Sequence, residues 1–85
     1  MKYGVALAKA AKRDLQRLEK ETQRRVANQL QILSETPRPP GVIKLRGAEN
    51  EWRFRVGDYR IIYEIDDGEH LITVLRIRHR REVYR

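Results

Sequence analysis

Arginine carries most of the potential chemistry in this chain. Guanidinium groups bind phosphate oxygens through paired hydrogen bonds, which makes arginine well suited to contacting nucleic-acid backbones. The side chains that give this signal are Arg53, Arg55, Arg60, Arg76, Arg78, Arg80 and Arg81, with Tyr59, Tyr63 and Tyr84 among them. Their convergence indicates an RNA or DNA contact surface, and a merely solvated charged face is the alternative.

Other residue types offer little chemistry. The chain has no cysteine, so it has no disulfide, no thiol nucleophile and no cysteine-based zinc site. Its two histidines do not make a metal site, and no phosphate-binding glycine loop, HExxH or GxSxG motif is present. Ser34 is expected to be a helix-end residue. His79 is expected to pack at the edge of the core.

Composition predicts one small domain spanning residues 1–85 with a polyanionic partner. The chain has 85 residues, 40% of them hydrophobic, and a net charge of +7. No apolar run reaches the length of a membrane span, and the N-terminus lacks a signal-peptide pattern. We therefore expect a cytoplasmic protein that does not enter a membrane.

Residues 51–65 are predicted to form the hairpin that positions the arginines. Polar and apolar residues alternate on both sides of Gly57-Asp58, which suits a two-residue type II′ turn. In that register Arg53, Arg55 and Arg60 share one face, where like charges lie side by side across the strands. The residues expected on the apolar face are Trp52, Phe54, Val56, Tyr59, Ile61, Tyr63 and Ile65.

The remaining elements complete an α+β domain. Apolar spacing predicts helices over residues 8–19 and 21–35, and the prolines from Pro37 onward prevent the second from continuing. Strands are expected at residues 1–7, 41–46 and 69–80. The predicted order is an N-terminal strand, an antiparallel helical hairpin and then an antiparallel sheet. The helices cover one sheet face, and the other face is open and basic.

The register of the last strand depends on the turn before it. A two-residue Asp67-Gly68 loop would place three arginines on the apolar face, at a cost of several kcal/mol each. A three-residue loop over residues 66–68 avoids that cost and is the predicted geometry. It turns Arg76, Arg78 and Arg80 to the basic face. The residues it turns to the helices are Leu71, Thr73, Leu75 and Ile77.

Three motifs make the chain resemble the RelE/ParE toxin superfamily. They are Lys44-Leu-Arg-Gly47, then Trp52-Arg-Phe-Arg-Val-Gly-Asp-Tyr-Arg-Ile-Ile-Tyr63, and finally Val74-Leu with His79-Arg80 and Glu82-Val83-Tyr84. The resemblance covers essentially the whole chain. It implies a type II toxin that cuts mRNA in the ribosomal A site without a metal or other cofactor. In that chemistry the 2′-hydroxyl of the substrate attacks the adjacent phosphate, leaving a 2′,3′-cyclic phosphate and a 5′-hydroxyl.

The resemblance also implies roles for individual residues. Arg60 would contact the scissile phosphate, Arg80 would stabilise the transition state or assist the leaving oxygen, and Tyr84 would stack on or orient the base. Arg53 and Arg55 occupy positions where some members have lysines. Because arginine cannot act as a proton acceptor, these two would supply charge, and the general base stays open between Tyr84 and a ribosomal group, with His79 and Glu64 as weaker candidates. The cations expected to bind substrate are Lys44, Arg46, Arg76, Arg78 and Arg81.

The expected partners are the ribosome with its mRNA and a small acidic, partly disordered antitoxin that folds on binding, in a toxin–antitoxin hetero-oligomer. Two alternatives have other consequences. A ParE-like protein would poison DNA gyrase by binding and would have no nuclease activity. An inactive relative would only bind its antitoxin.

Overall fold

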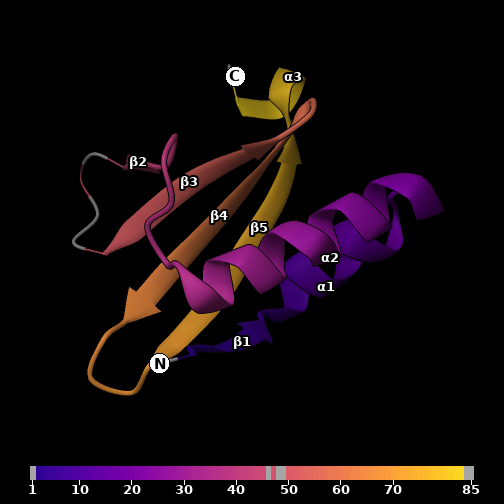
Figure 1. The fold of residues 1–85 in the computed structure, drawn as a ribbon. Helices are drawn as coiled ribbons and strands as arrows, with labels where there is room; N and C mark the ends of the chain where they lie inside the picture. Colours follow the sequence, from indigo (N-terminus) through magenta and orange to yellow (C-terminus); the bar gives the residue numbers. More distant parts are fainter. Residues whose placement is uncertain (1, 46, 48–49, 84–85) are drawn as a thin grey trace.

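The computed structural model describes residues 2–45, 47 and 50–83, and it has the predicted α+β architecture (Figure 1). The elements in chain order are β1 (Gly4–Leu7), α1 (Lys9–Gln16), α2 (Lys20–Glu35), β2 (Ile43–Lys44), β3 (Glu51–Val56), β4 (Tyr59–Asp66), β5 (Leu71–His79) and α3 (Arg80–Val83). The sheet order is β1-β5-β4-β3-β2. Neighbouring strands are antiparallel except β1, which pairs parallel with β5.

The two long helices lie along one side of the sheet because each carries an apolar stripe (Figure 1). Ala11 of α1 and Val26 and Leu33 of α2 are fully buried in the core. The C-terminal end of α2 is fixed to the chain start, since the Ser34 hydroxyl donates to the Tyr3 carbonyl oxygen at 2.6 Å. Ser34 is thus a helix-end residue, as expected.

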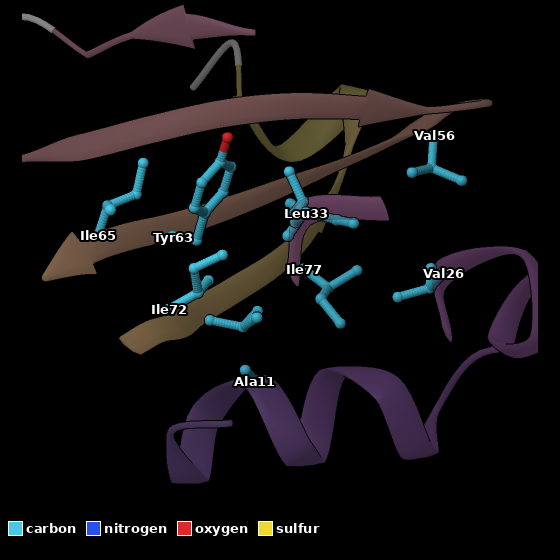
Figure 2. Packing of buried hydrophobic residues seen from close by; sticks show 10 residues of the cluster. Ala11, Val26, Leu33, Val56, Tyr63, Ile65, Ile72 and Ile77 are labelled. Carbon is cyan, nitrogen blue, oxygen red and sulfur yellow. The ribbon is translucent and has the colours of Figure 1, made fainter. Parts of the chain in front are cut away.

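The hydrophobic core fills the space between these helices and the sheet (Figure 2). Figure 2 shows Tyr63 and Ile65 of β4 pointing to the same layer as Ile72 and Ile77 of β5. Tyr63 has no exposed surface, and its hydroxyl donates to the Pro37 carbonyl oxygen at 2.8 Å. This burial raises the pKa of Tyr63 to about 12. The sheet therefore has one apolar face, and its polar residues lie on the other.

The β3–β4 hairpin has the predicted register. Val56 faces Tyr59, Arg55 faces Arg60, and the two-residue turn has Gly57 at a φ of 58°. A positive φ at this first central position favours glycine, in agreement with a type II′ turn. The arginines of both strands consequently project from the side opposite to the helices.

The turn between β4 and β5 differs from the prediction. It spans four residues instead of three, because Asp66 pairs with Leu71 and Ile65 pairs with Ile72. The buried residues in the first half of β5 are therefore Ile72 and Val74, and the expectation that Leu71, Thr73 and Leu75 face the helices was wrong.

An irregularity in this ladder restores the predicted sides further along β5. Tyr63 pairs with Val74 whereas Ile62 pairs with Arg76, so Leu75 is an extra residue on β5. Beyond it, Ile77 faces the core, and Arg76 and Arg78 lie in the rows of Ile62 and Arg60 on the other side. The four-residue turn and the bulge compensate for each other. The arginines at the end of β5 thus lie on the predicted sheet face, but in a register different from the one that the three-residue loop would give.

Candidate nucleic-acid interface

Three arginines form a row across the centre of the sheet. Arg55 on β3 lies opposite Arg60 on β4, and Arg60 lies opposite Arg78 on β5. The middle member, Arg60, is only 3% exposed, whereas Arg55 is exposed and Arg78 is partly buried. Like charges in adjacent strands destabilise a sheet, so this row is an arrangement that an anion would stabilise.

Arg80 is held at the end of this row by the turn between β3 and β4. Its amide donates to the Asp58 carbonyl oxygen at 2.7 Å, and its Nη1 lies 3.7 Å from Asp58 Oδ1. A pocket of about 130 Å³ opens there. Its lining residues are Arg55, Gly57, Asp58, Arg60 and Arg80. Three of the predicted site residues therefore meet at one small cationic pocket.

Arg53 and Arg76 occupy the next row on the same face. Each is paired across the sheet with Ile62 of β4, Arg53 from β3 and Arg76 from β5. Ile62 therefore separates these two cations, in contrast to the unbroken row of Arg55, Arg60 and Arg78. Within the described part of the chain, neither Arg53 nor Arg55 has an ion-pair partner.

Arg76 forms an ion pair with Asp14 of α1 at the edge of the sheet. Its Nε and Nη2 lie 2.8 and 3.3 Å from the two carboxylate oxygens, and Asp14 also accepts the Ile77 amide at 2.9 Å. Burial acts to raise the pKa of Asp14, but these hydrogen bonds and the charge of Arg76 outweigh burial and hold it below its usual value. Arg76, which was predicted to bind substrate, therefore shares its charge with a carboxylate.

The structure separates Lys44 from the arginine face. Lys44 on β2 lies opposite Trp52, and its Nζ is 5.8 Å from the centre of the Trp52 ring. Trp52 packs against the core on the helix side, so Lys44 lies on the face opposite to Arg60. Arg81 is exposed and lines a larger hollow beside Arg80. Arg46 and Tyr84, two further residues predicted to act on substrate, lie outside the described residues.

Neither histidine lines the cationic pocket, although His79 lines the neighbouring hollow with Asp58, Arg80 and Arg81. His79 packs edge-on against Tyr59 on the helix side, as expected, with the two ring centroids 5.1 Å apart. Its Nδ1 accepts a hydrogen bond from the Arg81 amide at 3.2 Å. His70 lies at the far end of β4 and contacts the ring of Tyr3 at 5.0 Å. The described residues contain no His, Cys, Asp and Glu cluster able to hold a metal ion. The geometry thus supports anion binding and charge stabilisation.

Sequence reasoning missed two acidic residues that shape this surface. Asp58 was assigned only a turn role, although its position two residues before Arg60 already placed it beside the arginines. Asp14 gave no local signal, because its partners Arg76 and Ile77 are 62 and 63 residues away in the chain.

No helix among the described residues is long and apolar enough to cross a membrane.

Known proteins are similar to this chain in sequence and in fold. The family model described as the ParE toxin of the type II toxin–antitoxin system parDE matches residues 5–84. The chain is 38% identical over 84 residues to Toxin RelE of Mycobacterium tuberculosis (strain ATCC 25618 / H37Rv), covering 98% of this chain and 87% of that protein. It is 33% identical over 86 residues to Toxin RelG of the same strain, covering 100% and 99%.

A solved structure agrees with these matches. The fold superposes on the toxin in the crystal structure of the archaeal RelE–RelB complex from Pyrococcus horikoshii OT3 with a TM-score of 0.83 and 35% identity. That alignment covers 94% of this chain and 97% of the other. With its sheet, its helical layer and the motifs around Arg60, the chain belongs to the RelE/ParE superfamily of type II toxin–antitoxin toxins.

Proposed function

We propose that this toxin is a ribosome-dependent endoribonuclease that cuts mRNA in the A site and thereby inhibits translation. The observation that carries the proposal is the row of Arg55, Arg60 and Arg78, which ends at a pocket completed by Arg80. Guanidinium groups match the geometry of phosphate oxygens and bind them through paired hydrogen bonds. The similarity to proteins named Toxin RelE and Toxin RelG supports the same reading.

The proposed reaction uses a nucleophile that the substrate supplies. The 2′-hydroxyl oxygen attacks the neighbouring phosphorus, and the bond from phosphorus to the 5′-oxygen breaks. Arg60 contacts the scissile phosphate from the floor of the pocket, and Arg80 stabilises the negative charge that develops there. Arg53 and Arg55 add positive potential, and Tyr84 orients the base. The chemistry calls for orientation and charge stabilisation, and it uses no metal or cofactor.

The proposed inhibitor is a small acidic antitoxin that folds on the toxin. The matching Pyrococcus structure is a complex of RelE with RelB, which supports a hetero-oligomer here. A net charge of +7 favours an acidic partner, and a disordered segment can wrap a surface larger than one pocket. Action on ribosomes would place the working toxin in the cytoplasm.

A ParE-like gyrase poison is the second candidate, because the family model that matches residues 5–84 describes ParE toxins. The two functions differ in what they ask of Arg60. A nuclease needs a cation at the scissile phosphate, whereas a protein that acts by binding gyrase does not. The arginine row therefore favours the nuclease.

The proposal is tested with purified toxin, ribosomes and a defined message. Wild-type protein should yield fragments ending in a 2′,3′-cyclic phosphate and beginning with a 5′-hydroxyl. Arg60→Ala and Arg80→Ala should each abolish cleavage and growth arrest while antitoxin binding persists. Because Arg60 is buried, circular dichroism must show that its variant is folded, and Arg60→Lys serves as the milder change. Growth arrest without cleavage would favour gyrase instead.

A further inference from the structure

The proposed cleavage needs a group that removes the proton from the attacking 2′-hydroxyl. Arginine cannot serve, because it stays protonated at any pH at which proteins fold. We propose that the carboxylate of Asp58 is this general base. The inference rests on the proposed nuclease function and adds a catalytic residue to it.

Asp58 is positioned by the two-residue turn between β3 and β4. It follows Gly57 in the two-residue turn, and its carbonyl oxygen accepts the Arg80 amide at 2.7 Å. Its carboxylate lies 3.7 Å from Arg80 Nη1 and lines the same pocket as Arg55 and Arg60. The Asp58 side chain is 66% exposed, so a substrate in the pocket can reach its oxygens. A rigid turn thus holds a proton acceptor beside the predicted phosphate site.

The pocket offers no competing acceptor among the described residues that line it. Apart from Asp58 its lining consists of Gly57 and three arginines. His79 contacts Tyr59 and lines the neighbouring hollow with Asp58, but it does not line this pocket. His70 lies beyond the other end of β4. Asp58 is therefore the one side chain lining this pocket, among the described residues, that carries a proton acceptor.

Cations surround the carboxylate, and they offset its repulsion from the substrate phosphate. Arg25 of α2 lies behind the turn, where its Nη2 would be 3.4 Å from a Cβ at Gly57. The charged and titratable groups that face the turn are Arg25, Arg55, Arg60, His79, Arg80 and Arg81. A carboxylate can approach a phosphodiester here because the net charge of this surface stays positive.

Proton transfer to Asp58 accompanies the attack on phosphorus. One Asp58 oxygen takes the proton of the 2′-hydroxyl while the 2′-oxygen forms a bond to phosphorus. The bond from phosphorus to the 5′-oxygen breaks, and the leaving oxygen takes a proton from water. Asp58 then releases its proton to solvent, so the enzyme returns to its starting state. Arg60 and Arg80 stabilise the charge on the phosphate throughout this transfer.

The experiment compares Asp58→Asn with wild type in single-turnover cleavage of a ribosome-bound message. Asparagine fits the turn and keeps an oxygen for Arg80, but it cannot accept the proton. The variant should be about 10²- to 10⁴-fold slower, the usual contribution of a general base. Its rate should also rise about tenfold per pH unit, because hydroxide must replace the lost base, and the wild-type rate should lack this slope. Asp58→Glu should recover part of the rate.

Glu69→Gln is the matched control. It removes one negative charge at the turn beyond the far end of β4, so its cleavage rate should equal that of wild type. An Asp58→Asn enzyme with a flat pH profile would overturn the inference, since Asp58 would then act only by positioning Arg80. A hydroxide-dependent rate in Tyr84→Phe instead would assign the base to Tyr84. Absence of any cleavage by wild type would refute the proposed nuclease itself.

Discussion

Asp14→Asn should destabilise the toxin, because this carboxylate ties α1 to the edge of the sheet. Strand β1 pairs with β5 only as far as Val74, and Asp14 takes over beyond that point by accepting the Ile77 amide and the Arg76 guanidinium. The Asp14 side chain is 10% exposed, so water replaces these contacts poorly. The variant should therefore loosen β5 next to Arg78.

The magnitude follows from the partners that are lost. A hydrogen bond to a charged group contributes about 1.5–3 kcal/mol, but the Arg76 side chain is 42% exposed and recovers hydration when the pair is broken. We expect a loss of about 2 kcal/mol in the free energy of unfolding at neutral pH. For a domain of this size, that corresponds to a decrease in Tm of roughly 10 °C.

The effect should also depend on pH, with a defined sign. The pKa of Asp14 is lower in the folded protein than in the unfolded chain, so its stabilisation is complete above about pH 4. It is lost as the pH falls through the lowered folded pKa. Wild type and Asp14→Asn should therefore converge in acid.

Urea unfolding of both proteins at neutral and acidic pH measures this difference. Glu21→Gln is the control, since its ion pair with Arg24 is 3.5 Å long and more than two-thirds exposed on both sides, and it should change stability very little. Equal stability of Asp14→Asn and wild type at pH 7, or a gap that does not change with pH, would refute the role given to Asp14.

Three further perturbations follow from the structure. Tyr63→Phe removes the hydroxyl that donates to Pro37 and should cost about 1 kcal/mol of unfolding free energy in urea titrations; an unchanged midpoint would contradict that bond. Gly57→Ala should destabilise by more than about 1 kcal/mol, because φ is positive and the new methyl group approaches Arg25; a higher Tm would contradict the turn geometry. The logarithm of the affinity for ribosomes, measured by co-sedimentation, should fall linearly with the logarithm of the salt concentration. Salt-independent binding would argue against the arginine surface.

The sequence predicted the β3–β4 hairpin because its information is local. Alternating residues on both strands and a Gly57-Asp58 turn define one register, and the structure confirms it. The first half of β5 was mispredicted because Leu71, Ile72, Val74 and Leu75 are all apolar, so alternation could not define the buried face.

The site was only partly predictable, because alternation along a strand defines the face of a residue but not its contacts with distant segments. The shared face of Arg55, Arg60 and Arg78 follows from strand alternation, whereas Arg80, which was expected to be the last residue of the strand, begins α3. The face on which Lys44 lies could not be predicted, because it depends on pairing with Trp52 and a two-residue strand carries no periodicity of its own. The Asp14 contact joins distant segments through tertiary structure alone.

Primer extension on one message, free and held on purified ribosomes, tests the central claim most directly. The proposed nuclease predicts cleavage only on the ribosome, at the A-site codon, and loss of that cleavage in Arg80→Ala. Cleavage of the free message at many positions would contradict dependence on the ribosome. No cleavage in either setting by a protein that still arrests growth would contradict the nuclease and transfer the function to another target.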